Sequence, residues 1–205
     1  MSPISADDAL VPDVDGWCHF AEREHSPNFD ERPTEVAVSL LVIHNISLPA
    51  GQYGTSYIAD LFCNRLDYHA DPSFEQLRGI RLSAHFLIRR DGRLIQFVST
   101  NSRAWHAGIS SFGGRPRCND FSIGVELEGA DTEGFTDAQY DLLSRLTAAL
   151  QRRHPLTDVA GHEHIAPGRK TDPGPFFDWS RYLTLLLQCQ PQALTYAPPR
   201  FSAFD

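Results

Sequence analysis

The continuous apolar run over residues 36–44 (VAVSLLVIH) limits the possible folds of this chain more than any other segment. Its β-branched residues are typical of a strand that is buried on both faces. Such a strand needs packed structure above and below it, which predicts a sheet flanked by helices. The run ends at His44, and the end of a buried strand is a common position for a functional site in α/β folds.

Two further segments have the pattern of strands. Residues 83–99 predict a hairpin, because SAHFLIR and RLIQFVS flank Asp91-Gly92, which is a strong turn signal. Residues 121–128 (FSIGVELE) predict a strand whose apolar residues share one face, with Glu126 and Glu128 on the other face.

Helices are predicted between and after these strands. Residues 55–66 carry apolar side chains at helical spacing. A longer helix begins after Thr136, which fits a capping box with Gln139, and it ends before Pro155. Another helix is expected over about 178–188. The order of strands and helices predicts an α/β fold with one central mixed β-sheet flanked by α-helices.

The length of 205 residues suits a single domain. We expect its core over about 36–190. Residues 1–35 are polar and turn-rich, and they are predicted to form an irregular wrap over the core. Residues 191–205, which are rich in proline and alanine, are predicted to form a peripheral tail.

The composition argues against several classes of partner. A net charge of −8 supplies no global basic field for nucleic acid or an anionic membrane. No apolar run approaches the roughly 20 residues of a membrane helix. Residues 1–17 have neither the basic start nor the apolar stretch of a signal peptide, so we expect a cytoplasmic protein. Four scattered cysteines without a Cys-x-x-Cys pair predict reduced thiols and no cysteine zinc site.

The nine histidines are more than one metal site needs. His25 and His69 lie in polar stretches and are expected at the surface. His154 falls in the last turn of a predicted helix, where a positive charge suits the helix dipole. His85 lies within a predicted strand and is expected to be a hydrogen-bonded core residue. His106, in RAWHAG, fits a site-lining role and a structural role equally well.

The segment 161–175 (GHEHIAPGRKTDPGP) has the composition of a site rather than of a packed element. It places two histidines, a lysine and an aspartate among glycines and prolines, which is hard to explain as packing. Imidazoles and one carboxylate form a good ligand set for zinc, and three protein ligands leave the fourth position open. His44 and Asp172 would share this set with either His162 or His164, between which residue chemistry does not choose.

Two further residues suit hydrolysis at such a metal. A nearby carboxylate can take the proton of the attacking water. Glu126 is preferred for this role over Glu128, which is expected at the rim because Gly129 follows it. Lys170 points to the same side as Asp172 in an extended chain, where its charge would stabilise an incoming negative charge.

Several motifs resemble the zinc N-acetylmuramoyl-L-alanine amidases, a family that includes enzymes of bacterial cell-wall recycling. Phage-type amidases and peptidoglycan recognition proteins are related to this family. The resemblance covers about residues 14–182, through VIHNISLP, SAHFLIRRDG, RAWHAG, RCNDFSIGVELEG, TDAQYD and GHEHIAPGRKTDPGPFFDW.

The resemblance implies one catalytic Zn²⁺ per chain, held by His44, His162 and Asp172. It implies Glu126 as the catalytic carboxylate and Lys170 as the residue that stabilises the oxyanion. His164 then falls at a variable position of the motif. The residues that match the family's contacts to the stem peptide and its carboxylates are Asn45, Arg81, Ala104 and Arg117. The arginine fork suits a carboxylate.

The implied function is hydrolysis of the amide bond between (1,6-anhydro-)N-acetylmuramic acid and L-alanine of muropeptides in cell-wall recycling. An alternative is a phage-type or exported amidase that acts on intact peptidoglycan. A non-catalytic peptidoglycan receptor is disfavoured, because all five positions are filled. A purely structural zinc would need a fourth protein ligand, for which His164 is the local candidate. The expected partner is a small muropeptide, with no nucleic acid, membrane or obligate protein partner.

Overall fold

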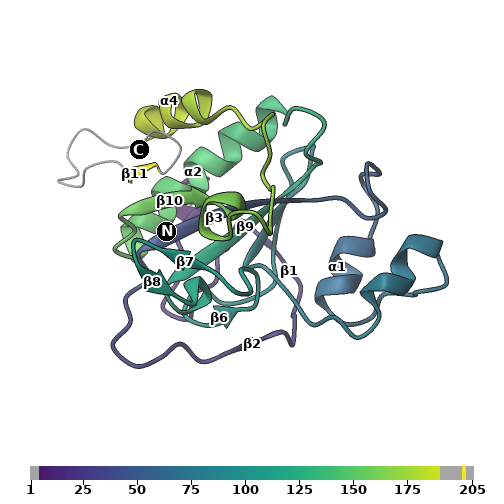
Figure 1. Ribbon diagram of the computed structural model, residues 1–205. Helices are drawn as coiled ribbons and strands as arrows, with labels where there is room; N and C mark the ends of the chain where they lie inside the picture. Colours follow the sequence, from purple (N-terminus) through teal and green to yellow (C-terminus); the bar gives the residue numbers. More distant parts are fainter. Residues whose placement is uncertain (1–4, 190–199, 202–205) are drawn as a thin grey trace.

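A seven-stranded sheet forms the centre of the protein (Figure 1). The computed structural model describes residues 5–189 and 200–201. The strands of the sheet are β1 (Glu22–Arg23), β3 (Leu40–Ile46), β4 (Phe86–Ile88), β5 (Leu94–Gln96), β9 (Ser122–Glu128), β10 (Asp158–Gly161) and β11 (Arg200–Phe201). Their spatial order is β1-β5-β4-β9-β3-β10-β11. The β4–β5 pair is antiparallel and the other neighbours are parallel, so the sheet is mixed, as predicted.

The remaining elements surround this sheet. They are the α-helices α1 (Tyr57–Phe62), α2 (Asp137–Arg153), α3 (His162–Ile165) and α4 (Trp179–Cys189), the 3-10 helices η1 (Asp8–Leu10), η2 (Pro72–Leu77) and η3 (Cys118–Asp120), and the short strands β2 (Phe29–Asp30), β6 (Arg103–Ala104), β7 (Ser111–Phe112) and β8 (Arg115–Pro116). Strand β2 pairs with β6, and β7 pairs with β8. The tail expected over residues 191–205 lies outside the described residues, apart from the two residues of β11.

The central pair of strands is β3 and β9. Five successive residues of β3, from Leu40, are buried, which confirms the buried strand expected from the apolar run. The strand begins at Leu40 and not at the predicted Val36, and it does not end at His44 as predicted, because pairing with β9 continues to Ile46, which is opposite Glu128. The same register places His44 directly beside Glu126.

The local signals for the hairpin and the long helix are confirmed. Strands β4 and β5 pair antiparallel around the predicted Asp91-Gly92 turn. Helix α2 begins after Thr136, whose side chain accepts from the backbone N–H of Gln139 in the predicted capping box. Helix α1 is shorter than the predicted 55–66, because Asn64 has a left-handed φ of 58° that ends the helix.

The two faces of the sheet are covered differently. Helices α2 and α4 lie together over one face (Figure 1), where Ile43, Val125 and Val159 belong to the largest apolar cluster. On the other face, Leu87 packs with α1 and η2, while Val42 belongs to a separate cluster that includes residues of β10 and α3. Strand side chains alternate between faces, so His44 and Glu126 leave the sheet on this second face.

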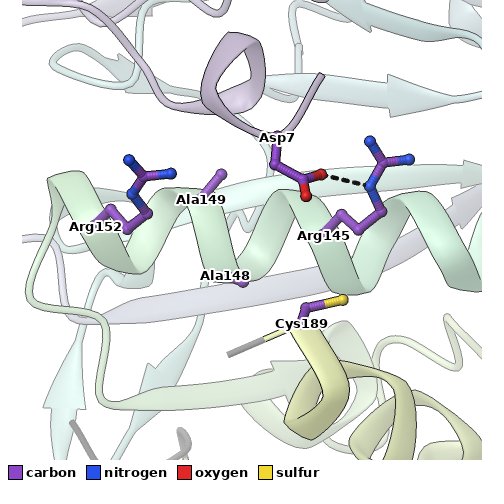
Figure 2. A pocket seen from close by; sticks show the side chains of 6 residues that line it. All are labelled: Asp7, Arg145, Ala148, Ala149, Arg152 and Cys189. Atoms are coloured by element: carbon purple, nitrogen blue, oxygen red, sulfur yellow. Dashed lines mark hydrogen bonds and ion pairs between the residues drawn. The ribbon is translucent and has the colours of Figure 1, made fainter. Parts of the chain in front are cut away.

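A small pocket borders the helical layer (Figure 2). Its lining residues are Asp7, Arg145, Ala148, Ala149, Arg152 and Cys189. An ion pair of 2.7 Å between Asp7 and Arg145 ties the N-terminal segment to α2. The pocket contains none of the residues predicted for the site, so we assign it no part in the chemistry. Among the residues that the structure describes, no helix is long and apolar enough to cross a membrane.

Candidate metal centre

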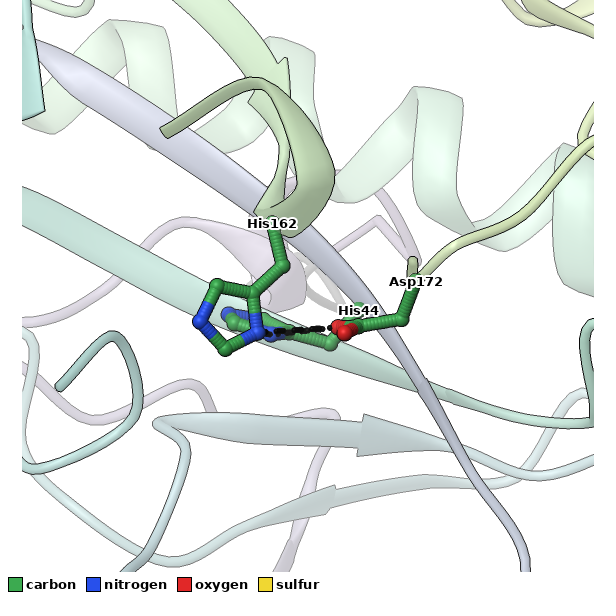
Figure 3. Close-up of side chains that lie close together, drawn as sticks. All are labelled: His44, His162 and Asp172. Atoms are coloured by element: carbon green, nitrogen blue, oxygen red, sulfur yellow. Dashed lines mark hydrogen bonds and ion pairs between the residues drawn. The ribbon is translucent and has the colours of Figure 1, made fainter. Parts of the chain in front are cut away.

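Neighbouring parallel strands bring the two histidines of the predicted ligand set together. Strand β10 pairs with β3 in a register that places Gly161 beside Ile43. His44 and His162 each follow one of these residues, so both side chains emerge at the same edge of the sheet. Figure 3 shows Asp172 reaching the two rings from the loop after α3. The carbonyl oxygen of Asp172 accepts from the backbone N–H of Glu163 (2.8 Å), which fixes this loop against α3.

The three side chains converge on one point. His44 Nδ1, His162 Nδ1 and Asp172 Oδ2 lie 3.0 Å from one another in every pair. The ligand atoms of a tetrahedral zinc lie about 3.3 Å apart when each is about 2.0 Å from the metal. Both histidines are almost fully buried. The arrangement therefore fits a small cation with three protein ligands.

Hydrogen bonds alone do not satisfy this triangle. An ionised carboxylate only accepts, and each imidazole presents a single nitrogen to the cluster. His162 Nε2 donates to the carbonyl oxygen of Ala107, so the Nδ1 atom of a neutral His162 ring carries a lone pair that faces Asp172 Oδ2 at 3.0 Å. One cation satisfies all three lone pairs at once, so the donor set favours a metal over a purely protein-bonded cluster.

The protonation states also suit a metal. Burial lowers the pKa of His44 to about 4, which leaves the imidazole neutral at physiological pH. Burial alone would raise the pKa of Asp172, but its close contacts with the rings of His162 and His44 outweigh this effect and hold that pKa well below its usual range. Neutral imidazoles and an ionised carboxylate are the forms that bind a divalent cation.

The Nε2 atoms of His44 and His162, which face away from the cluster, both have hydrogen-bond partners. His162 Nε2 donates to the carbonyl oxygen of Ala107 (3.1 Å). His44 Nε2 lies 2.9 Å from His106 Nδ1. Such partners fix the ring orientation and the tautomer of a ligand histidine.

The two glutamates of β9 have different surroundings. Glu126 lines the same pocket as the three-residue cluster, and its Oε2 atom is buried without a hydrogen-bond partner. Burial and the charge of Asp172 raise the pKa of Glu126 well above its usual value, while Lys170 lowers it. The free carboxylate oxygen beside the cluster makes Glu126 the better proton acceptor of the two.

Glu128 is not at the rim as predicted; it is a buried structural residue. Its Oε1 accepts from the backbone N–H of Gly54 (2.7 Å) and from Arg89 Nη1 (3.1 Å). Its Oε2 accepts from the backbone N–H of Arg90 (3.2 Å). The loop before α1 and the residues after β4 thus close over Glu128, whose exposed fraction is 1%.

The pocket at the cluster is small and partly enclosed. Its volume is about 190 Å³, and it is lined by His44, Asn45, Ile46, Leu82, Ser83, His106, Glu126, His162, Lys170 and Asp172. Lys170 is exposed and lowers the pKa of both Glu126 and His44, so its charge acts on the cluster. A pocket of this size holds the reacting end of a substrate and leaves the rest of a larger molecule on the rim.

The predicted substrate contacts are only partly brought to this pocket. Asn45 lines it, but both of its amide hydrogen bonds go to the protein, to Asp131 Oδ1 (2.6 Å) and to the carbonyl of Pro173 (3.0 Å). Arg81 is exposed one residue before the lining residue Leu82.

The other two predicted contacts do not line the pocket. Ala104 is fully buried in β6. Arg117 is exposed, is paired with Asp120 (3.1 Å) and has a left-handed φ of 62°, a conformation that costs a non-glycine residue energy.

The remaining histidines lie outside the cluster. His25 and His69 are exposed, and His85 is buried, with Nδ1 accepting from the backbone N–H of Gly124 (3.0 Å), as predicted. His164 Nδ1 accepts from the backbone N–H of Gly161 (2.9 Å), which is a structural role. His154 does not supply a charge to the helix end: burial lowers its pKa to about 4, and its ring turns inward to Thr100 (2.9 Å).

Sequence reasoning missed two residues that brace the centre. Arg169 Nη2 donates to the carbonyl oxygen of Ala107 (2.8 Å), the same oxygen that accepts from His162 Nε2, and to the carbonyl oxygen of Ile109 (2.6 Å). Gly124 lets the His106 ring approach β9, because a Cβ at this position would lie 2.5 Å from His106 Cγ. The contacts of Arg169 could not be predicted, because its partners are backbone carbonyls, which every residue has. Gly124 could have been noticed, because a glycine inside a strand pattern indicates such a close approach.

Residues 34–175 match the family described as N-acetylmuramoyl-L-alanine amidase. The chain belongs to this amidase family. This amidase is 51% identical over 183 residues to the 1,6-anhydro-N-acetylmuramyl-L-alanine amidase AmpD of Citrobacter freundii, covering 88% of this chain and 98% of that one. It is also 51% identical over 173 residues to the AmpD of Escherichia coli K12, covering 83% and 94% of the two chains.

Solved structures agree with the predicted fold. The crystal structure of a selenomethionine derivative of AmpD matches this amidase with a TM-score of 0.84 and 52% identity, over 86% of this chain and 99% of the other. AmiD from E. coli, in a complex with the substrate anhydro-N-acetylmuramic acid-L-Ala-D-γ-Glu-L-Lys, matches with a TM-score of 0.54 and 28% identity, over 77% of this chain and 65% of AmiD. The predicted family and fold class are confirmed.

Proposed function

We propose that this amidase hydrolyses the amide bond between 1,6-anhydro-N-acetylmuramic acid and L-alanine in muropeptides, with one zinc ion held by His44, His162 and Asp172. The observation that carries this proposal is the triangle of three ligand atoms beside the unpartnered carboxylate oxygen of Glu126. The AmpD relatives support the anhydro-muramyl substrate, since they match this chain over nearly their whole length.

The chemistry divides between the metal and the side chains around it. A zinc ion bound there supplies Lewis acidity, which polarises the scissile carbonyl and lowers the pKa of water. Glu126 accepts one proton from the water whose oxygen attacks the carbonyl carbon of the lactyl group. Glu126 then returns this proton to the alanine nitrogen as the carbon–nitrogen bond breaks.

Lys170 and the pocket rim have complementary roles. The ammonium group of Lys170 stabilises the negative charge that develops on the carbonyl oxygen. Because the pocket holds about 190 Å³, the stem peptide lies across the rim. The exposed guanidinium groups of Arg81 and Arg117 are proposed to bind its carboxylates there. Asn45 is proposed to contact the peptide with its amide oxygen, since its amide hydrogens already bond to the protein.

We also place the reaction in the cytoplasm. All four cysteines are free, and Cys18 and Cys118 are buried. Free thiols suit a reducing compartment.

The test is a comparison of two substrates with the full-length, zinc-loaded protein. Purified anhydro-muropeptide and polymeric peptidoglycan are incubated with the enzyme at equal stem-peptide concentration, and the products are identified by mass spectrometry. We expect anhydro-N-acetylmuramic acid and a free peptide that begins with alanine, with much faster release from the small substrate. Equal or faster release from polymeric peptidoglycan would favour an amidase of the intact wall. No cleavage of either substrate with zinc bound would overturn the proposal in favour of a receptor.

A further inference from the structure

The ring of His106 lies between a proposed ligand and the strand beneath it. His106 Nδ1 is 2.9 Å from His44 Nε2, and His106 Nε2 is 3.1 Å from Ser122 Oγ. The ring stacks directly over Gly124, where a Cβ would lie 2.5 Å from His106 Cγ. His106 lines the pocket but is not one of the three residues whose ligand atoms converge. It therefore adjoins the cluster without belonging to it.

The role of His44 at the cluster determines which nitrogen carries the hydrogen in the rings of His44 and His106. His44 Nδ1 faces the cluster, so its lone pair is needed there and its hydrogen sits on Nε2. That hydrogen is donated to His106 Nδ1, which must therefore carry none. The hydrogen of His106 is then on Nε2, from which it is donated to Ser122 Oγ.

The same chain segment orients the second histidine. The carbonyl oxygen of Ala107 accepts from His162 Nε2 (3.1 Å). Asn119 Oδ1 accepts from the backbone N–H groups of both His106 (3.2 Å) and Ala107 (2.8 Å). Two consecutive residues, braced by one asparagine, thus hold the outer nitrogens of both ligand histidines.

We propose that His106 is a positioning residue of the metal centre, which fixes His44 in the tautomer with hydrogen on Nε2 and aims its Nδ1 lone pair at the metal. This inference rests on the proposed function, in which the cluster holds zinc. Residues that hydrogen-bond to metal ligands typically change metal affinity by about 10–100-fold when they are replaced. We expect a loss of that size when His106 can no longer accept from His44.

The test compares three variants of the full-length chain. His106→Phe keeps a ring of similar size but has no acceptor. His106→Asn places its amide oxygen where Nδ1 stood and so accepts from His44. His154→Phe is the matched control, because His154 is also buried but contacts Thr100 and does not line the pocket. The zinc dissociation constant is measured by chelator competition, and the melting temperature of each metal-free protein is measured in parallel.

We expect His106→Phe to bind zinc about 10–100-fold more weakly. His106→Asn should stay within about threefold of wild type and His154→Phe should match it. The metal-free His106→Phe protein should melt close to the wild type. Unchanged zinc affinity in His106→Phe, or an equal loss of affinity in the Phe and Asn variants, would overturn this inference and leave the proposed function intact. Failure of the wild-type protein to bind zinc would overturn the proposed function as well.

A measurement on the wild-type protein does not depend on how the variants fold. Proton–nitrogen correlation spectra of the histidine side chains, with ¹⁵N labelling, report which ring nitrogen carries hydrogen. The inference requires hydrogen on Nε2 of His106 and none on Nδ1 in the zinc-loaded protein. A hydrogen on His106 Nδ1 would overturn it.

Discussion

Replacing each of two glutamates on β9 with glutamine separates the proposed proton acceptor from a structural carboxylate. Glu126 and Glu128 leave the same face of the strand and are both buried. Glu126 Oε2 has no hydrogen-bond partner. Glu128 accepts three hydrogen bonds, one of them from the nearly buried guanidinium group of Arg89.

The structure sets the expected magnitudes. Glu126→Gln removes the proton acceptor, and this should lower the rate of hydrolysis by about 10²–10⁴-fold. It should change the free energy of unfolding by no more than about 1 kcal/mol, because no bond to Oε2 is lost. Glu128→Gln leaves the charge of Arg89 buried without its partner, which costs about 3–5 kcal/mol. For a domain of this length, that cost lowers the melting temperature by roughly 10 °C.

The assay is kcat/KM for anhydro-muropeptide together with thermal unfolding, both on zinc-loaded protein. Glu126→Gln should melt near wild type and be nearly inactive. Glu128→Gln should melt lower but keep most of its activity at a temperature where it is folded. Near-normal turnover by Glu126→Gln, or an inactive Glu128→Gln with a normal melting temperature, would refute this division of roles.

Three further predictions follow from individual contacts. Lys170→Met should move the acid limb of the kcat/KM profile to higher pH. Burial and Asp172 raise the pKa of Glu126 and Lys170 lowers it, so this pKa rises further when Lys170 is replaced. Only ionised Glu126 accepts a proton, and a higher pH is then needed to ionise it. A shift to lower pH would show that the sign is wrong. Burial, Arg153 and Arg32 lower the pKa of His154 from 6.5 to about 4, so the native state should lose up to about 3 kcal/mol as the pH falls through that interval. His154→Gln should flatten this part of the stability curve, and an unchanged slope would contradict the assignment. His164→Ala should keep its zinc and lose about 1 kcal/mol of stability, because the N–H of Gly161 loses its acceptor; loss of zinc would instead make His164 a ligand.

Elements with strong local signals were predictable from the sequence. The long apolar run of β3, the Asp91-Gly92 turn and the capping box at Thr136 each specify local structure without distant partners. Strand β10 was missed, since its four residues are too few to show a period. Its position beside β3 depends on pairing between residues more than 100 positions apart. That pairing is what brings His44 and His162 together.

The site residues were also predictable only where their position does not depend on contacts between distant parts of the chain. The motif chemistry of segment 161–175 predicted a metal centre, but a pattern of residue types did not choose between His162 and His164. The register of β10 and the hydrogen bond of His164 to Gly161 provide a physical reason for choosing His162. The burial of Glu128 was also out of reach, because its partner Arg89 is 39 positions away and meets it only across two paired strands.

The most direct test of the account is a zinc titration of the metal-depleted enzyme, with hydrolysis of anhydro-muropeptide as the readout. Turnover should be absent without metal, rise in proportion to added zinc and level off at one zinc per chain, and an Asp172→Ala variant should show no such rise at the same zinc concentrations. Full turnover by the metal-depleted protein, or an Asp172→Ala variant that titrates like wild type, would contradict the account.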